Sequence, residues 1–315
     1  QLWMGAHPSG DAEVLDGRDP PRSLGSWLAE HPACLGPKVR DAFGGRLPFL
    51  FKVLSVRTAL SIQAHPNKEL AAKLHAQFPQ HYPDANHKPE MAIALTPFEG
   101  LCGFRPVEEI AAFLRAAKGQ DTSASNGELL LRLHAQFPGD IGCFSIYFLN
   151  VVRLEPGEAM FLAANEPHAY LQGDCVECMA CSDNTVRAGL TPKFIDVLTL
   201  CEMLNYTPAP SSSKIFPAVQ SPLDPCVFIY DPPVPDFTLM RIEIPSSIKL
   251  YLISALDSAS ILLVIQGTAM GTSTAAASEM TLRRGSVIFI SANESISLHL
   301  SSSEGMLLFR ACCLL

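Results

Sequence analysis

Polar side chains alternate with apolar ones in the segment Ser61-Ile-Gln-Ala-His65, which leads into a Pro-Asn turn. In an extended strand, residues two positions apart share a face, so Ser61, Gln63 and His65 would point the same way. Such a face offers an amide oxygen and an imidazole nitrogen to a metal ion or to a polar ligand. The alternative is the solvated face of an edge strand.

A carboxylate precedes the apolar run Met91–Leu95, which we expect to be a buried strand. Glu90, at the mouth of this strand, needs a hydrogen bond, a cationic partner or a metal ion, because burial of an unpaired charge is costly. Alternation along the chain puts Lys88 on the same side as Glu90. The alternative is a Lys–Glu pair at the surface.

A sequence repeat contains a second candidate histidine. Residues 154–168 align without gaps to residues 282–296, and Leu, Gly, Phe, Ala, Asn and Glu coincide. The pattern is typical of one β-module, a glycine turn followed by a strand and an asparagine turn, that is used twice. The last aligned position is His168 in the first copy and Ile296 in the second. A single histidine is more often structural than a ligand, but the repeat favours a ligand and restricts a metal site to the first copy.

These segments together offer four metal ligands, namely Gln63, His65, Glu90 and His168. Zinc binds imidazole nitrogen and carboxylate oxygen, and it keeps an open position in catalytic sites. Gln63 would be a weaker, neutral ligand that leaves the ion more Lewis-acidic. Because the set contains no thiolate, iron, manganese or nickel would also fit.

Three charged residues in the segment 173–194 could serve a substrate. Arg187 and Lys193 flank a glycine-containing turn, an arrangement that suits a phosphate group. Glu177 lies upstream of them in a stretch that we expect to be a strand. The alternative for all three is ordinary surface charge.

The cysteines point to a reducing compartment. Cys175, Cys178 and Cys181 have the spacing C-x2-C-x2-C, but in a strand Cys178 would face away from the other two, and no fourth cysteine follows closely. We therefore expect buried free thiols and no metal cluster. Ten cysteines in 315 residues are too few for a disulfide scaffold. The C-terminal Cys312-Cys-Leu-Leu fits a prenylation motif formally, but it ends a predicted closing strand, and lipidation is not expected.

The composition excludes two classes of partner. The chain is 48% hydrophobic and 17% charged, so it can bury a large core. Its net charge of −8 and its lack of a basic stripe argue against nucleic-acid binding. The longest apolar run, 261–265, is far shorter than the roughly 20 residues of a membrane span, and no signal peptide is visible. We expect a cytoplasmic protein without nucleic-acid or membrane partners.

Short strands between proline and glycine turns account for most of the chain, a pattern typical of a sandwich, jelly roll or barrel. The predicted strands are 49–56, 145–152, 159–162, 248–256, 261–266 and 287–290. Helices are predicted at 23–30, 67–76, 106–117 and 128–136. The Pro/Ser-rich segment 206–225 is the best candidate for a linker.

Five motifs resemble those of the type I mannose-6-phosphate isomerase family, and the similarity is close to the animal members. It covers nearly the whole chain. The motifs are LPFLFKVLSV (47–56), LSIQAHPN (60–67), NHKPEM (86–91), GLCGFR (100–105) and SDNTVRAGLTPK (182–193).

The resemblance implies a mainly β fold, in which a cupin-type jelly-roll catalytic domain carries a short helical insertion and is followed by a second jelly-roll domain. We assign residues 1–112 and 139–205 to the catalytic domain and 113–138 to the insertion. Residues 206–225 are then the linker and 226–315 the C-terminal jelly roll. Compared with the family, we expect the insertion to be short and an N-terminal segment to be missing.

The resemblance also implies one zinc ion per chain and a set of site residues. The implied zinc ligands are Gln63, His65, Glu90 and His168. The family's catalytic arginine corresponds to Arg187, and its substrate-pocket residues correspond to Ser61, Lys88, Glu177 and Lys193.

The implied reaction is the reversible isomerisation of mannose 6-phosphate and fructose 6-phosphate through an enediol-type intermediate, carried out by a monomer. Glu177 is our hypothesis for the base, with Lys88 as the second candidate. Arg187 would stabilise negative charge or the phosphate, which Lys193 and Ser61 would hold. One alternative is a non-catalytic, shortened isomerase-like protein that binds metal or sugar phosphate. Another is an iron-dependent cupin oxygenase, against which Gln63 and the phosphate-binding cations argue.

Overall fold

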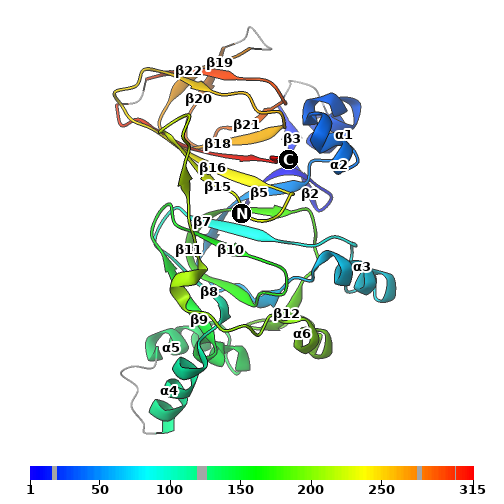
Figure 1. Cartoon of the computed structure of the whole chain (residues 1–315), viewed down its shortest axis with the longest axis vertical. Coiled ribbons are helices and arrows are strands. Elements are labelled where there is room, and N and C mark those ends of the chain that lie inside the picture. Colours follow the sequence, from blue (N-terminus) through cyan, green and yellow to red (C-terminus); the bar gives the residue numbers. More distant parts are fainter. Residues whose placement is uncertain (16–19, 119–125, 275–278, 302) are drawn as a thin grey trace. The chain divides into compact units, whose positions relative to one another are not determined.

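The computed structural model describes residues 1–15, 20–118, 126–274, 279–301 and 303–315 (Figure 1). The chain divides into two compact units. Unit 1 comprises Gln1, Val53–Glu177 and Cys181–Phe216, and unit 2 comprises Leu2–Lys52, Cys178–Ala180 and Pro217–Leu315. Strands β5 (Phe49–Val56) and β11 (His168–Ala180) contribute residues to both units.

Unit 1 is built around antiparallel strands that carry the predicted site residues. Strand β11 pairs with β6 and β8, β6 also pairs with β12, and β8 also pairs with β9. Strand β10 lies between β7 and β13. The bounds are β6 Ile62–Ala64, β7 Glu90–Ala94, β8 Phe98–Phe104, β9 Leu149–Leu154, β10 Ala159–Leu162, β12 Val186–Gly189 and β13 Ile215–Phe216.

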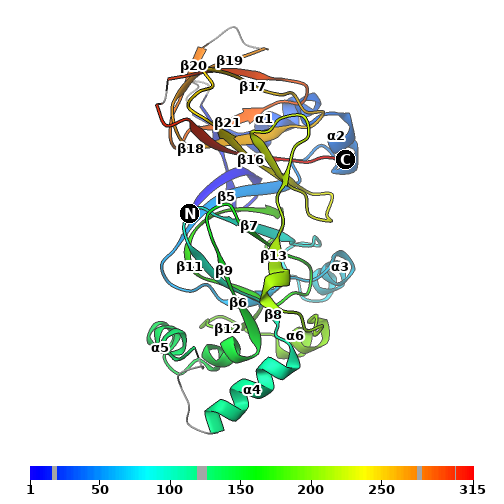
Figure 2. The same ribbon diagram turned by 60° about the vertical axis from the view of Figure 1, so that its left-hand side comes forward.

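Helices pack at the margins of these strands. Helix α3 (Lys68–Gln77) is capped by Asn67, whose side chain accepts a hydrogen bond from the Leu70 amide, and helix α6 is Val197–Met203. Both contribute to one apolar cluster, of which Leu74, Val186 and Met203 are members. Figures 1 and 2 show α4 (Val107–Lys118) and α5 (Gly127–Gln136) beyond β8 and β9. The buried face of α5 packs against residues of β8 and β11.

Unit 2 contains a β-sandwich. One sheet has the strand order β14-β15-β16-β23-β18-β21, and the other has the order β17-β22-β19-β20. Buried side chains of both sheets, such as Leu262, Leu308 and Leu298, form one core cluster. The bounds are β14 Val219–Gln220, β15 Val227–Tyr230, β16 Thr238–Ile244, β17 Leu250–Ile253, β18 Ser260–Gln266, β19 Ala269–Ser273, β20 Glu279–Leu282, β21 Val287–Ile290, β22 Ile296–Leu300 and β23 Met306–Cys312.

The N-terminal part of unit 2 consists of short elements. They are β1 Leu2–His7, β2 Gly10–Asp11, β3 Glu13–Val14, β4 Arg22–Ser23, α1 Leu24–Glu30, the 3-10 helix η1 Pro32–Leu35 and α2 Pro37–Ala42. Helix α1 is capped by Ser23, whose hydroxyl accepts a hydrogen bond from the Ser26 amide.

The sequence repeat is a structural repeat. Strands β10 and β21 occupy equivalent positions, and β11 begins at His168 where β22 begins at Ile296. The glycines that precede β10 and β21 have φ values of 89° and 86°, a left-handed conformation that glycine adopts without strain. The asparagines before β11 and β22 have φ values of 66° and 64°. One backbone module is therefore used twice, as the sequence predicts.

The mainly β prediction is confirmed, as are all four predicted helices to within one or two residues at each end. Of the predicted insertion 113–138, residues 119–125 lie outside the described part of the chain. The predicted strand 145–152 is wrong in its first half. That stretch belongs to the 3-10 helix η2 (Ile141–Tyr147), because Asp140 caps it by accepting from the Gly142 amide and also from the Thr191 amide.

Two other segments differ in detail from the prediction. Strand β17 is shorter than the predicted 248–256. The Pro/Ser-rich segment 206–225 contains the 3-10 helix η3 (Ser211–Lys214), and it supplies β13 to unit 1 and β14 to unit 2. Proline and serine content predicts the lack of long elements there, but not these short pairings.

The sandwich core yields a stability test with an internal control. Leu298 is fully buried on β22, whereas Leu250 on the neighbouring β17 is 63% exposed. Leu298→Ala removes buried apolar surface and leaves a cavity, so we expect a loss of about 2–5 kcal/mol in the free energy of unfolding. Leu250→Ala makes the same chemical change at the surface and should cost less than about 0.5 kcal/mol. Urea unfolding followed by circular dichroism measures both, and equal losses would contradict the assignment of this core.

Candidate metal centre

Three side chains from distant segments converge inside unit 1. His65 directly follows β6, Glu90 begins β7 and His168 begins β11. One potential ligand atom from each lies within 4.8 Å of the others. All three residues are buried, with exposed fractions of 0%, 2% and 1%. The strands fix these positions, since each residue lies at a strand end where neighbouring strands are already paired.

The atoms that face one another are all hydrogen-bond acceptors. Each imidazole donates through Nδ1 to a backbone carbonyl: His65 to Asn184 at 2.7 Å and His168 to Glu166 at 2.8 Å. This bonding assigns the proton to Nδ1 and leaves a lone pair on each Nε2. These Nε2 atoms lie 3.4 Å and 3.2 Å from Oε2 of Glu90, and none of the three atoms has a hydrogen-bond partner.

The three atoms His65 Nε2, His168 Nε2 and Glu90 Oε2, here called the metal group, fit a bound cation. Two lone pairs and a carboxylate oxygen that are buried together repel one another unless a positive charge lies between them. Burial lowers the pKa of His65 by more than the carboxylate of Glu90 raises it, which favours the neutral ligand form. Burial opposes ionisation of Glu90, but neighbouring positive charge, including the Lys88 ammonium, outweighs burial and holds the pKa of the Glu90 carboxyl well below its usual range.

Lys88 lies beside this group. Its Nζ is 3.5 Å from Oε1 of Glu90, on the same side, as alternation along the chain predicts. The side chains of Lys88 and Glu90 are only 13% and 3% exposed, so the alternative of a surface pair is wrong.

Strand pairing places Gln63 next to the histidine of β11, and Arg187 one strand farther away. Gln63 on β6 lies directly opposite His168 on β11 and directly opposite Arg187 on β12. Residues directly opposite each other in an antiparallel pair project from the same face, with Cβ atoms about 5 Å apart. His168, Gln63 and Arg187 therefore form a row across three strands.

Arg187 and Lys193 line one cavity of about 210 Å³, which supports their grouping. His81 and Phe194 line it too, and their rings stack at 4.5 Å between centroids. Lys193 is exposed, whereas Arg187 is half-buried. Ser61 lies immediately before β6 and is half-buried. Two cations at one cavity are suited to an anionic substrate group.

Tyr170 is a candidate that the sequence analysis missed. It lies two residues after His168 on β11 and is buried, with the Glu177 carboxylate beside it. Burial, followed by the nearby carboxylates of Glu177 and Glu90, raises the pKa of Tyr170 well above its usual value. Glu177 is itself 3% exposed. The two-residue strand period, applied onward from His168, would have identified Tyr170.

The remaining sequence candidates behave as structural residues. Cys175 and Cys178 are buried and Cys181 is half-buried, and none of them forms a disulfide. Within the described ranges, His65, Glu90 and His168 are the group with metal-binding geometry. Cys312 is buried at the end of β23. Among the helices that the structure describes, none combines the length and the apolar character that crossing a bilayer requires.

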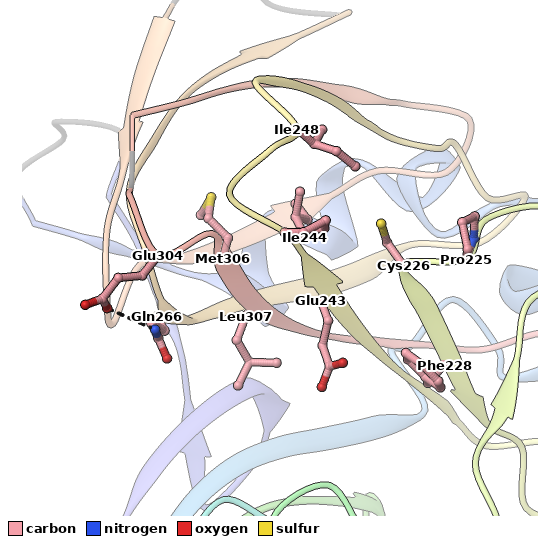
Figure 3. A pocket seen from close by; sticks show the side chains of 11 residues that line it. Pro225, Cys226, Phe228, Glu243, Ile244, Ile248, Gln266, Glu304, Met306 and Leu307 are labelled. Carbon is pink, nitrogen blue, oxygen red and sulfur yellow. Dashed lines mark hydrogen bonds between the residues drawn. The ribbon is translucent and has the colours of Figure 1, made fainter.

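A larger cavity, of about 550 Å³, lies in unit 2 (Figure 3). Its walls are mostly apolar, with Ile244, Ile248 and Met306 among them, and it also exposes Glu243 and Glu304. No histidine lines it, and no predicted site residue does. Volume alone therefore does not identify the reactive site of this chain.

Family models match most of the described architecture. The model for the phosphomannose isomerase type I catalytic domain matches residues 1–107, that for the helical insertion domain of the same family matches 106–149, and that for its C-terminal region matches 228–270.

Curated relatives match along the full chain. Mannose-6-phosphate isomerase of Bos taurus is 57% identical, and that of Homo sapiens is 55% identical; both alignments cover 100% of this chain and 89% of the relative. Each alignment is 376 residues long, so these relatives contain residues that have no counterpart in the 315 of this chain.

Solved structures agree with this result. A single-site mutant of phosphomannose isomerase from Salmonella typhimurium has 31% identity and a TM-score of 0.87, with 100% of this chain and 91% of that chain covered. A zinc-bound mannose 6-phosphate isomerase has 30% identity and a TM-score of 0.85, with 99% and 90% covered. The chain therefore belongs to the type I phosphomannose isomerase family.

Proposed function

We propose that this chain is a zinc-dependent aldose–ketose isomerase that interconverts mannose 6-phosphate and fructose 6-phosphate. Its family and the names of its curated relatives support the reaction, and a zinc-bound structural neighbour supports the metal. The observation that carries the proposal is the buried group of three acceptor atoms without hydrogen-bond partners on His65, Glu90 and His168. We infer a monomeric, cytoplasmic enzyme that feeds GDP-mannose biosynthesis.

One zinc ion would be held by His65, Glu90 and His168, with Gln63 as the fourth ligand. The strand register supports Gln63, because it lies directly opposite His168. When bound, zinc would polarise the carbonyl and hydroxyl oxygens of the sugar and stabilise an enediolate. The protein supplies the rest: fixed orientation, a proton carrier and charge complementarity.

The isomerisation moves a proton between C1 and C2 of the sugar, so a base must take the proton from one carbon and deliver it to the other. Glu177 is our first candidate for the base, and its near-complete burial beside Tyr170 is consistent with a protected proton path. Lys88 is the second candidate, since it lies beside Glu90. General-base catalysis of this kind is typically worth about 10²–10⁴-fold in rate.

The phosphate would be held at the cavity that Arg187 and Lys193 line, with Ser61 as a further contact. Arg187 lies two strands from His168, about 10 Å away at the usual strand spacing. That separation suits a six-carbon sugar phosphate whose reactive end reaches the metal group. A fixed phosphate supplies binding energy that orients the carbons.

Removal of one proposed ligand tests the metal. His168→Ala should abolish stoichiometric zinc binding and reduce isomerase activity by about 10³-fold or more, because the three ligands that remain, one of them the weak neutral amide of Gln63, hold zinc poorly. His299→Ala, at an exposed position on β22, is the matched control and should leave both unchanged. Metal analysis, together with fructose 6-phosphate formation from mannose 6-phosphate, measures the result. Zinc without turnover in the unaltered chain would identify a non-catalytic binder, and iron with oxygen uptake an oxygenase.

Substitution of Glu177 tests the base. Glu177→Gln keeps the shape and removes the proton acceptor, so kcat should fall about 10²–10⁴-fold while zinc content stays at one per chain. The pH–rate profile should also lose the limb that the base contributes. A variant profile that keeps this limb would transfer the role to Lys88.

Substitution of Lys193 tests the phosphate site. Lys193→Met removes one exposed cation from the cavity, and we expect KM for mannose 6-phosphate to rise about 10-fold, equivalent to about 1.4 kcal/mol, with a smaller change in kcat. Lys249→Met, at an exposed position in unit 2, is the control. Steady-state kinetics at constant ionic strength compare the two, and an equal KM in both variants would remove Lys193 from the site.

A further inference from the structure

A carboxylate outside the metal group connects two loops of unit 1. Oδ1 of Asp84 accepts hydrogen bonds from the Asn86 amide at 2.9 Å, from the Ser182 hydroxyl at 2.8 Å and from Nδ2 of Asn184 at 3.1 Å. Its Oδ2 accepts from the Asp183 amide at 2.8 Å. All four donors lie in the segments 84–86 and 182–184, which are almost 100 residues apart in sequence.

Asn184 connects Asp84 to the metal group, because its side chain contacts Asp84 and its backbone carbonyl contacts His65. Its side chain is buried, and Nδ2 also lies 2.7 Å from the Asp84 carbonyl and 2.9 Å from the Asn86 carbonyl. The backbone carbonyl of the same residue accepts the Nδ1 proton of His65 at 2.7 Å. The position of that carbonyl is therefore set by how the 84–86 loop holds the Asn184 side chain.

The two joined loops also lead directly into other proposed site residues. Residues 84–86 run into Lys88 and Glu90, and residues 182–184 run into β12, which carries Arg187. A ring hydrogen bond to a fixed carbonyl sets the tautomer and orientation of a metal-binding histidine, and loss of such support typically weakens metal binding.

We propose that Asp84 is a positioning residue for the metal centre: it ties residues 182–184 to residues 84–86 so that the Asn184 carbonyl holds His65 with Nε2 free. This inference rests on the proposed function, because it assumes that His65 is a zinc ligand. Asp84 itself touches none of the three acceptor atoms, and its effect passes through Asn184.

The substitution Asp84→Asn tests this role most directly, because it replaces a single carboxylate oxygen by an NH2 group of similar size. In Asp84→Asn, one oxygen can still accept, but the NH2 group must then face either the Asp183 amide or the Asn86 amide and Asn184 Nδ2, all of which are donors. We expect the zinc dissociation constant to rise about 10–100-fold and kcat to fall, while KM for the sugar phosphate changes little. Competition with a chromophoric zinc chelator measures the dissociation constant independently of turnover.

Asp224 provides a matched control in unit 2. Its Oδ1 accepts from the amide two residues ahead, that of Cys226, at 2.9 Å, as Asp84 does from Asn86. Its Oδ2 accepts from the Tyr251 hydroxyl at 2.5 Å. Asp224→Asn removes a comparable turn-forming carboxylate, so it can lower stability, but the zinc dissociation constant should stay within twofold of the unaltered chain.

The outcomes separate this inference from the proposed function. If the unaltered chain binds no zinc, the proposed function fails. If it binds zinc and folded Asp84→Asn binds it equally tightly, the positioning role is overturned. Should Asp84→Asn not fold, Ser182→Ala decides, since it removes one of the four donors to Asp84; a severalfold weaker affinity supports the role and an unchanged affinity refutes it.

Discussion

The burial of three acceptor atoms against one another is the constraint on which this fold depends. Two imidazole lone pairs and the Glu90 carboxylate share a space that water does not reach, and no proton lies between them. Such a group is electrostatically unfavourable by itself and becomes favourable around a cation. The surrounding structure holds the three side chains in place. The strand ends fix their backbones, and a backbone carbonyl that accepts from Nδ1 fixes the orientation of each imidazole ring.

Much of this site could be predicted from sequence, because it follows short-range rules. Strand alternation put Lys88 beside Glu90, as the structure confirms. The same rule grouped Gln63 with His65, and the register places Gln63 opposite His168. The position of Glu90 at the start of an apolar run predicted a buried carboxylate that needs a partner. The repeat separated His168 from Ile296, and thereby indicated which of two similar modules could bind a metal. These rules need only neighbours along the chain.

What the sequence could not supply depends on contacts between distant segments. The 3-10 helix η2 replaces a predicted strand because Asp140 also holds Thr191, some 50 residues away. Tyr170 is an exception, because the two-residue strand period, applied onward from His168, is a local rule that would have identified it. The contacts of Asp84 with the loop at 182–184 require knowledge of which loops meet. Alternation within a strand gives no information on such long-range pairings.

The two copies of the repeated module differ in the residue that begins the last strand. In the first copy, His168 begins the strand and lies opposite Gln63 and Cys102. In the second copy, Ile296 begins the strand, lies opposite Ile253 and Ser273, and is part of the apolar core of the sandwich. Of the strand partners that the structure describes there, neither Ile253 nor Ser273 offers a carboxylate to a histidine at this position. If the reaction takes place in unit 1 alone, the second copy of the module is constrained only by packing. Unit 2 should then tolerate more amino-acid substitutions than the strands that carry the metal group.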